Sequence, residues 1–527
     1  MAVKIPKIDD IPEEERTPLM LVLLESLNAL QEENQALRDE IARLKGQKPK
    51  PKIKPSKLES RRKKRTKTGG KRPGSAKRKK SQTLEIHNTV PVPPGNLPPG
   101  SWFKEYNDFL VQGLRFTPFN TLYRLERWES PGGRTFAGKL PPELNGGHFD
   151  PELRRFVLYQ YYQAHVTQPL LLEQLDEIGI DISSGQLSKI IIEGHDTFHT
   201  EKDAILKNGL AVSEHIQVDD TGARHEGKNG YCTHIGNELF ATFHSTSSKS
   251  RINFLELLRA GYSDYAINPD ALSYMASQGL PKAQLEKLST LAPVVIDDDK
   301  KWKELLESLD FEKGRHIRIA TEGALIGSLV EHGFNTGMVI VSDDAGQFNI
   351  LNHALCWVHA ERLINKLVGF NDEQKLAVKS TRSKIWDLYD SLKDFKEHPE
   401  EQKRAGIEAR FDEIFTEKTC FATLNSALKR IHRNKPELLK VLDHPDIPLH
   451  NNLSENDIRE YVKRRKVSGS TRSSLGRRCR DTFTSLKKTC RKLKISFWEY
   501  LKDRLCGLNV LPYLPDVVAL KAQEIYG

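Results

Sequence analysis

HIQVDDT, residues 215–221, has the pattern of a short β-strand that ends in two acids. A second stretch, GMVIVSDD at residues 337–344, is a continuous apolar run that also ends in acids. Such a run is typical of a strand buried on both faces of a parallel or mixed sheet. A helical pattern at residues 320–332 precedes it. The order strand, helix, strand predicts an α/β fold, and acids at strand ends indicate a site at the edge of the sheet.

Alternation along the first strand separates its two acids. Side chains at every second position share a face, so Asp219 lies with His215 and Gln217, whereas Asp220 lies with the apolar Ile216. We therefore take Asp219, on the more polar face, as the candidate functional acid. A turn and a further strand pattern, residues 239–244, follow.

Asp343 and Glu455 complete a trio of candidate acids. The pattern NNLSENDIREYVKRRK, residues 451–466, predicts a helix capped by Asn452 or Ser454, with Glu455 in its first turn. One carboxylate on a helix can face two on strands. Such a trio could hold two Mg²⁺ or Mn²⁺ ions, roughly 3.5–4 Å apart, that stabilise an in-line displacement at phosphorus.

Each of these acids also has an ordinary interpretation. Asp219 and Asp343 could be turn or cap residues. Glu455 could simply pair with Arg459, one helical turn later. The acids are 124 and 112 residues apart along the chain, and this spacing does not choose between the roles.

Positive charge is concentrated in two stretches of the 527-residue chain, whose formal net charge is +10. Residues 48–80 carry 17 Lys or Arg and one acid, and residues 459–494 carry 14 Lys or Arg and two acids. Such stretches release counterions when they neutralise phosphates, so DNA is the natural partner; a solvated, solubilising run is the alternative. The residues expected to contact DNA are Arg61, Arg62, Lys63, Lys64 and Arg65 in the first stretch and Lys463, Arg464, Arg465, Lys466 and Arg472 in the second.

A heptad pattern near the N-terminus predicts a coiled coil. Leu23, Leu30, Leu37 and Leu44 occupy one heptad position, and Asn34 is the polar residue at the other. A polar Asn there favours a parallel two-stranded coil, so we expect the chain to form a homodimer through this segment. A single amphipathic helix packed on its own protein is the alternative.

Membrane and secreted classes are disfavoured. The longest apolar run near the N-terminus, residues 19–24, is too short to span a bilayer and lacks a signal-peptide cleavage site. The six cysteines contain no CxxC pair, so neither a disulfide framework nor a zinc ribbon is indicated. A reducing cytoplasm fits best, with no membrane partner.

A helix-turn-helix pattern lies at residues 166–192, VTQPLLLEQLDEIGIDISSGQLSKIII. Ser183 or Ser184 can cap its second helix. That helix would present Ser184, Gln186 and Lys189 to a DNA groove. Such helix pairs are also common in proteins that never touch DNA.

Taken in order, these features resemble the insertion-sequence-sixty-six family of bacterial transposases over most of the chain. The family's first acid lies in an Asp-Glu-Thr motif, which is matched by Asp219, Asp220 and Thr221. Its second acid precedes a Cys-x-x-His-x-x-Arg motif, matched by Asp343 and then by Cys356, His359 and Arg362. Its third lies in Asn-Asn-x-x-Glu-x-x-x-Arg, matched by Asn451, Asn452, Glu455 and Arg459. The stretch KVSGSTRSSLGRR, residues 466–478, resembles the family's basic tail of the DDE domain.

The resemblance implies an RNase H-like DDE domain that binds double-stranded DNA, cleaves transposon ends and joins them to a target. It places His359 and Arg362 near the scissile phosphate, with accessory proteins of the element as possible partners and the bacterial nucleoid as the location. This sequence departs from the family in two ways. The small N-terminal module has no cysteine, so the family's zinc site is lost. Asp344 stands where Gly is usual, so Asp343 and Asp344 remain alternatives.

His353, Cys356 and His359 could suggest a zinc site. Three ligands so close along one strand-to-helix passage make structural zinc the less favoured interpretation. We expect Cys356 to pack in the core instead.

The expected organisation has eight parts: a leucine-zipper coiled coil at 14–46, a basic disordered linker at 47–82, a small β-rich module resembling a zinc ribbon without its cysteines at 83–147, a helix-turn-helix region at 148–200, a first part of the DDE domain at 211–370, an all-α insertion at 371–445, a last part of the DDE domain with the catalytic Glu at 446–505, and a C-terminal tail at 506–527. Two other functions stay open. The chain could be a catalytically inactive or domesticated DNA-binding protein, or an RNase H-like nuclease that cleaves without strand transfer.

Overall fold

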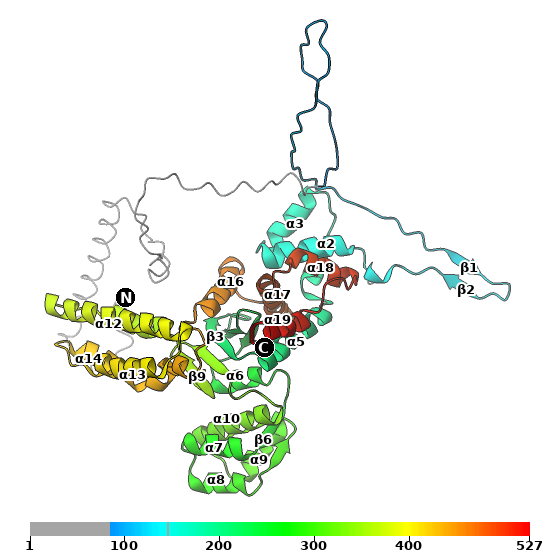
Figure 1. Cartoon of the computed structure of the whole chain (residues 1–527). Coiled ribbons are helices and arrows are strands. Elements are labelled where there is room, and N and C mark those ends of the chain that lie inside the picture. The colour runs from blue at the N-terminus through cyan, green and yellow to red at the C-terminus, as the bar shows by residue number, and fades with distance from the viewer. Residues whose placement is uncertain (1–84, 145–146, 527) are drawn as a thin grey trace, which may run out of the picture. The chain divides into compact units, whose positions relative to one another are not determined.

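The computed structural model describes residues 85–144 and 147–526. The predicted coiled coil at 14–46 and basic linker at 47–82 lie outside the described residues, and so do Arg61, Arg62, Lys63, Lys64 and Arg65. The chain divides into two compact units, residues 1–115 and 116–527, which are described separately (Figure 1).

The β-rich module expected over residues 83–147 is reduced, within the described residues, to one hairpin. Residues 85–126 contain no helix or strand, so the alternating apolar residues at 85–92 and 121–128, which are typical of strands, form none apart from the short start of β1. β1 (Arg127–Glu129) pairs antiparallel with β2 (Thr135–Ala137), and the 3₁₀ turn η4 (Pro142–Leu144) follows. The side chains of residues 85–129 are exposed, so their apolar alternation has no second layer to bury it.

A mixed five-stranded sheet forms the centre of the larger unit, in the order β5-β4-β3-β8-β9. Its strands are β3 (His215–Gly222), β4 (Tyr231–Gly236), β5 (Ala241–Thr246), β8 (Val339–Ser342) and β9 (Asn352–Leu355). β3, β4 and β5 pair antiparallel, whereas β3, β8 and β9 pair parallel. The two strands predicted from the acid-ending stretches are therefore confirmed, and they are neighbours.

Strand β8 is buried on both faces, as its unbroken apolar run predicts. Ile340 packs in the largest hydrophobic cluster, which extends over the helices on one side of the sheet. Val339 and Val341 pack in a second cluster, formed with helices of residues 372–442 on the other side. Because all three side chains are fully buried, this strand has no polar face.

Edge strand β5 is covered by the side chains of helix α17 (Ser474–Lys492). The backbone N–H of Ser245 donates to Asp481 (2.7 Å), that of Phe243 to Ser485 Oγ (2.9 Å), and that of Ala241 to Thr489 Oγ1 (3.2 Å). The three acceptors are four residues apart, so they lie on one helix face. These side chains take the place of a sixth strand, because they accept hydrogen bonds from the backbone N–H groups of β5 that no neighbouring strand pairs.

Helices precede the sheet in the larger unit. They are α2 (Pro151–Leu158), the π-helical turn η5 (Tyr159–Gln163), α3 (Gln168–Glu177), α4 (Ser184–Ile192) and α5 (Asp196–Val212). The two helices of the predicted helix-turn-helix are α3 and α4. Ser183, one of the two predicted caps, is the N-cap of α4: its hydroxyl accepts from the N–H of Gln186, whose side chain accepts from the N–H of Ser183.

Replacing this cap gives a first testable expectation. Ser183→Ala should lower the free energy of unfolding by about 1 kcal/mol, because the N–H of Gln186 loses its acceptor. Ser184→Ala is the matched control, since its hydroxyl makes no cap bond and its side chain is exposed. Urea denaturation of both variants measures the difference, and equal stabilities would contradict the assigned cap.

A lobe lies between β5 and β8, and of its elements only the helix predicted at 320–332 was expected from the sequence. It comprises α6 (Arg251–Leu258), β6 (Tyr265–Ile267), α7 (Pro269–Ser277), α8 (Lys282–Ser289), β7 (Val294–Ile296), α9 (Asp299–Ser308) and α10 (Gly314–Glu331). β6 pairs antiparallel with β7, and α10 crosses them (Figure 1). A Cβ on Gly327 would lie 2.2 Å from the carbonyl oxygen of Ala266, so only glycine permits this close crossing.

The segment between β9 and Glu455 is helical, as expected. It contains α11 (Trp357–Asn365), α12 (Asp372–Glu397), α13 (Glu401–Thr416), α14 (Ala422–Arg433), α15 (Lys435–Leu438) and the 3₁₀ turn η6 (Lys440–Leu442). Helices α12, α13 and α14 lie along one another (Figure 1).

The chain continues with α16 (Asn452–Ser468), α17, α18 (Phe497–Cys506) and α19 (Leu514–Tyr526). The expected tail at 506–527 thus contains a helix, α19, which packs on α5. Buried Glu201 of α5 accepts from Tyr500 (2.7 Å), Arg504 (2.9 Å) and the N–H of Leu514 (3.0 Å). The result is a mixed α/β fold rich in helices, in whose described residues no helix is long and apolar enough to cross a bilayer.

Candidate active site

Two of the predicted acids lie at the same edge of the sheet. β3 and β8 are parallel, and Gln217 is opposite Val341 in their register. Asp219 lies two residues after Gln217, inside β3, and Asp343 lies two residues after Val341, directly after the end of β8. The two acids are therefore neighbours at the point where the pairing of β3 with β8 ends. Both are partly buried.

The third acid is brought to this edge by the start of helix α16. Asn451, the residue before α16, donates from its side chain to the carbonyl of Val218 (2.8 Å) and from its backbone to Cys356 Sγ (3.2 Å). Glu455 lies one helical turn later. The prediction that Asn452 or Ser454 caps α16 is wrong: Asn451 is the N-cap residue, and its side chain bonds to β3 instead of to the helix.

The charges of Asp343 and Glu455 act on Asp219. Burial is the main cause that raises the pKa of Asp219 to about 7, and the negative charges of Asp343, Glu455 and Asp220 raise it further. The N–H of Asp220, 2.7 Å from Asp219 Oδ1, opposes the shift. Asp219, Asp343 and Glu455 therefore share one electrostatic environment, although they come from distant parts of the chain.

The two neighbouring acids have structural partners. Asp220 accepts from Thr233 Oγ1 (2.6 Å) and from Gln347 Nε2 (2.7 Å). Asp344 accepts from Arg430 Nε (3.1 Å) on α14 and from Asn434 Nδ2 (3.3 Å). These contacts favour Asp219 over Asp220, and Asp343 over Asp344, as the acids that face the shared site.

Two residues of α11 lie beside Glu455. Arg362 Nη1 is 3.1 Å from Glu455 Oε1, and His359 Nε2 is 3.6 Å from the same oxygen. Burial lowers the pKa of His359, while the charges of Glu455 and Asp343 partly oppose this. Arg459 is also 3.6 Å from Glu455, so the ordinary ion pair considered from the sequence is present as well.

The donor set suits a hard divalent cation, because carboxylates supply oxygen ligands. Across residues 85–144 and 147–526, however, no three His, Cys, Asp or Glu side chains are close enough to form a ready ligand cage. Glu455 is paired with Arg362 and His359 instead.

The Cys356 region does not have the character of a zinc site. Burial is the main cause that raises the pKa of Cys356 to about 11, which disfavours the thiolate that zinc binds. His353 Nε2 lies 2.8 Å from Ser342 Oγ. Cys356 is almost fully buried, which confirms the prediction that it packs in the core.

Most described residues predicted to contact DNA are at the surface. Lys463, Lys466 and Arg472 are exposed, and so are Ser184, Gln186 and Lys189 of α4. Arg465 is half-buried and donates to Thr221 Oγ1 (3.3 Å) and to the carbonyl of Gly222.

Arg464 is the exception, and its predicted role as a DNA contact is wrong. Its residue surface is only 3% exposed. Its guanidinium donates to the carbonyl of Tyr161 (2.8 Å) and lies 3.8 Å from the centre of that residue's ring. The basic stretch at 459–494 suggested DNA contact, but a run of basic residues does not show which of their side chains are buried.

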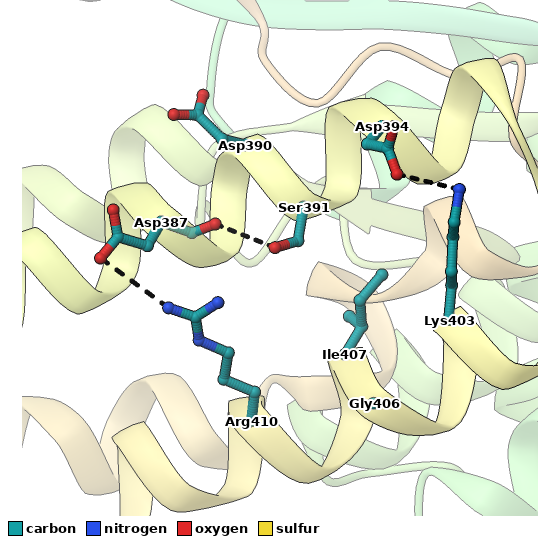
Figure 2. A pocket seen from close by; sticks show the side chains of 8 residues that line it. All are labelled: Asp387, Asp390, Ser391, Asp394, Lys403, Gly406, Ile407 and Arg410. Carbon is teal, nitrogen blue, oxygen red and sulfur yellow. Dashed lines mark hydrogen bonds and ion pairs between the residues drawn. The ribbon is translucent and has the colours of Figure 1, made fainter.

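A pocket of about 220 Å³ opens beside the acids, lined by Asp343, Asp344, Ala345, Leu355, Cys356, His359, Ala360, Arg362, Leu363, Lys366, Arg430, Ile431, Asn434 and Leu438. Lys366 and Arg430 were not predicted from the sequence, because the end of α11 and helix α14 come together only in the folded chain. A second pocket, of about 510 Å³, lies between α12 and α13 (Figure 2). None of the three candidate acids lines it. Its Asp387 is paired with Arg410 (3.8 Å) and its Asp394 with Lys403 (3.0 Å), so we assign it no catalytic role.

Buried charges behind Glu455 were also missed from the sequence. Asp457 lies 2.8 Å from Lys492, 3.1 Å from Lys488 and 3.3 Å from His234. Burial alone would raise the pKa of Asp457, but the hydrogen bond and charges of these partners outweigh it and hold that pKa well below its usual value. The cluster fixes α16 against β4 and α17, and thereby fixes the turn that carries Glu455.

Asp219→Asn should raise the free energy of unfolding of the metal-free protein at pH 8. Since the pKa is about 7 in the folded chain and 3.8 as the ordinary value, the folded state binds the proton more tightly. The stability due to that proton is complete below about pH 4 and is lost as the pH rises through about 7. With allowance for partial exposure, the ionised carboxylate costs on the order of 2–4 kcal/mol at pH 8.

Urea denaturation at pH 8 and pH 5 tests this expectation. The gain from Asp219→Asn should fall by more than half at pH 5. Asp220→Asn is the control: it weakens the contacts with Thr233 and Gln347 and should destabilise the protein at both pH values. A loss of stability for Asp219→Asn at pH 8 would contradict the shared electrostatic environment.

Comparison with known proteins gives two matches. Residues 298–478 match the family described as "Transposase IS66 family", a range that includes Asp343 and Glu455 and leaves Asp219 outside. The chain is also 44% identical, over 322 residues, to "Uncharacterized protein y4jO" of Sinorhizobium fredii (strain NBRC 101917 / NGR234), which corresponds to 60% of this chain and 100% of that protein. The chain belongs to the IS66 family of transposases.

Proposed function

We propose that the chain is the DNA transposase of a bacterial insertion sequence, with a DDE active site formed by Asp219, Asp343 and Glu455. The observation that carries the proposal is the parallel register of β3 and β8, which makes Asp219 and Asp343 neighbours in a chain that matches the transposase family; the charges of Asp343 and Glu455 also raise the pKa of Asp219, after burial. Like-charged groups gathered at a sheet edge are an arrangement that a bound cation stabilises.

The domain that holds these acids is proposed to be RNase H-like. Support comes from the mixed sheet, in which an antiparallel set of strands is continued by parallel strands. Further support comes from the placement of two acids on β3 and after β8, with the third on a later helix.

Asp219, Asp343 and Glu455 would hold two Mg²⁺ or Mn²⁺ ions. Such ions, when bound, polarise the phosphodiester and stabilise the attacking and leaving oxygens. His359 and Arg362 would then meet the scissile phosphate, since both lie at the site and Arg362 is partly exposed. In the resting protein Arg362 offsets the charge of Glu455.

Two displacements at phosphorus make up the proposed reaction. In the first, water attacks a phosphodiester at the transposon end, the bond to the 3′ oxygen breaks, and a 3′-OH is released opposite a 5′-phosphate. In the second, that 3′-OH attacks a phosphodiester of the target, which forms a new phosphodiester and releases a target 3′-OH. Neither step needs a covalent bond to the enzyme.

DNA binding is proposed to involve α4, the exposed basic residues after Glu455, and the basic linker at 47–82. Dimerisation through the segment at 14–46, help from accessory proteins of the element, and association with the bacterial nucleoid belong to the same proposal. The exposed positions of Lys189, Lys463, Lys466 and Arg472 support the proposed DNA contacts.

A cleavage and joining assay tests the proposal and separates it from its rivals. The full chain is incubated with Mg²⁺, a labelled duplex carrying the inverted repeats that flank the gene, and a circular target DNA. A transposase gives nicked ends and joined products, and both disappear when the cation is chelated. A DNA-binding protein without activity shifts the duplex without cutting it, and a nuclease cuts without joining; either result would overturn the proposal.

A further inference from the structure

A surface pocket away from the candidate acids lies between η5 and the turn that joins α17 to α18. Its volume is about 460 Å³, and its lining residues are Tyr159, Gln163, Lys487, Arg491, Lys494, Ile495, Ser496, Phe497 and Trp498. The lining has three cationic side chains and no acidic one. None of these residues belongs to the site described above.

The positive charge of the pocket is available to a ligand. Arg491 and Lys494 are exposed, and within residues 85–144 and 147–526 neither side chain has an ion-pair partner. Lys487 is different, because it is buried and donates to Glu460 (2.9 Å) and to the carbonyl of Tyr162 (2.7 Å). One cation is therefore fixed in the wall, while the other two face solvent.

Aromatic side chains make the pocket rigid. Tyr159 packs edge-on against Trp498, with ring centres 5.0 Å apart, and stacks on Phe497 at 6.3 Å. The guanidinium of Arg155 lies 4.1 Å from the centre of the Trp498 ring. A basic surface with aromatic side chains between its cations is suited to a nucleic-acid backbone.

The backbone at the pocket is set by the ends of two helical segments. Lys494 has a φ of +61° because it directly follows the C-cap of α17, where a left-handed residue commonly ends a helix, and the N–H of Ile495 bonds to the carbonyl of Cys490 (2.8 Å). The other wall includes η5, a π-helical turn, a form that occurs frequently at functional sites.

The pocket also borders the helix pair that resembles a DNA-reading motif. The turn η5 packs against α3, α17 and α18, and α17 packs against α4. A duplex seated on α4 would thus meet a rigid part of the same unit. Contacts to phosphates fix the position of a duplex, whereas contacts to base edges specify its sequence.

We propose that this pocket binds phosphate groups of the DNA backbone through Arg491 and Lys494. The inference rests on the proposed function, because it concerns the DNA on which the transposase acts. It adds a positioning contact that neither the acids nor the helix pair supplies. The alternative is that the two charges only keep the surface soluble.

Salt-dependent DNA binding by the double variant Arg491→Gln, Lys494→Gln tests the proposal. Glutamine removes the charge, keeps a long polar side chain and leaves the left-handed position with a residue of similar backbone preference. The matched control is Lys282→Gln, Lys313→Gln, which removes two exposed charges from the lobe between β5 and β8. All proteins are full chains, and fluorescence anisotropy measures their affinity for the end duplex between 50 and 200 mM salt.

The slope of log affinity against log salt concentration should become shallower by about 1.8, since each lost phosphate contact contributes about 0.9. At 100 mM salt the affinity should fall about tenfold. The control should keep the slope of the unaltered protein.

Each outcome bears on the proposal. If the double variant and the control have equal slopes and affinities while the unaltered protein binds and cleaves DNA, the pocket is not a phosphate site, and the transposase proposal stands. If the unaltered protein neither binds nor cleaves the duplex, the proposed function fails and this inference fails with it. Weaker binding that is independent of salt would also contradict a phosphate contact.

Discussion

Asp219→Asn, Asp343→Asn and Glu455→Gln are each expected to reduce DNA strand cleavage by about 10³-fold or more while DNA binding is retained. Each substitution removes one carboxylate from the group whose charges raise the pKa of Asp219. Loss of a single ligand is enough to disable a pair of cations that must hold two oxygens at once. Single-turnover cleavage of a pre-nicked and an intact end duplex measures the effect.

Neighbouring acids provide matched controls for this result. Asp344→Asn changes a residue whose side chain contacts Arg430 and Asn434 at the surface of α14. It should keep cleavage within about tenfold of the unaltered protein, because it removes no proposed ligand. Normal cleavage by the Asp219→Asn and Asp343→Asn proteins, or equal losses for Asp344→Asn and Asp343→Asn, would remove the assignment.

Asp457→Ala is expected to lower the free energy of unfolding by about 3–5 kcal/mol. The substitution leaves the ammonium groups of Lys488 and Lys492 buried without their carboxylate partner. A buried ammonium group without a nearby carboxylate destabilises the folded protein far more than the same ammonium group in an ion pair. Urea denaturation followed by circular dichroism measures the loss.

Asn456→Ala is the matched control, since this neighbour is exposed and its side chain accepts a hydrogen bond from exposed Arg459 (2.9 Å). It should change stability by less than about 0.5 kcal/mol. In conditions where Asp457→Ala is still folded, cleavage should also be reduced, because the first turn of α16 carries Glu455. A fall of less than about 1 kcal/mol for Asp457→Ala would contradict the structural role of the buried cluster.

Strands β3, β5 and β8 of the sheet could be predicted because local residue patterns indicate their burial, whereas β4 and β9 were not predicted. The apolar run at 337–344 predicts a strand with no polar face, and Ile340 and Val341 do pack into different clusters. The lobe between β5 and β8 could not be predicted in the same way. Its strands β6 and β7 are each three residues long, too short to show a periodic pattern.

In the module expected at 83–147, by contrast, the sequence predicted more strands than the described residues contain. Alternating residues suggested strands at 85–92, yet alternation stabilises a strand only if a partner and a second layer are present. The described part of this region has neither beyond the β1–β2 hairpin. Burial of this kind depends on distant residues and is not encoded in the segment itself.

The candidate acids could be predicted, but the residues that position them could not. Asp219 and Asp343 follow from strand ends that meet at one edge. The bond from Asn451 to Val218 and the ion pairs of Asp457 join residues that are far apart in the chain and have no shared motif. Arg464 shows the same limit, since a run of basic residues does not indicate which one is buried.

Binding of Mn²⁺ to the full chain in complex with end DNA, followed by electron paramagnetic resonance at pH 7.5, tests the central claim most directly. The unaltered protein should bind Mn²⁺ saturably and show the spectral coupling of two nearby ions. Asp219→Asn, Asp343→Asn and Glu455→Gln should each weaken that binding and abolish the coupling. Equal Mn²⁺ binding by the unaltered protein and all three variants would contradict a cation site built from these acids.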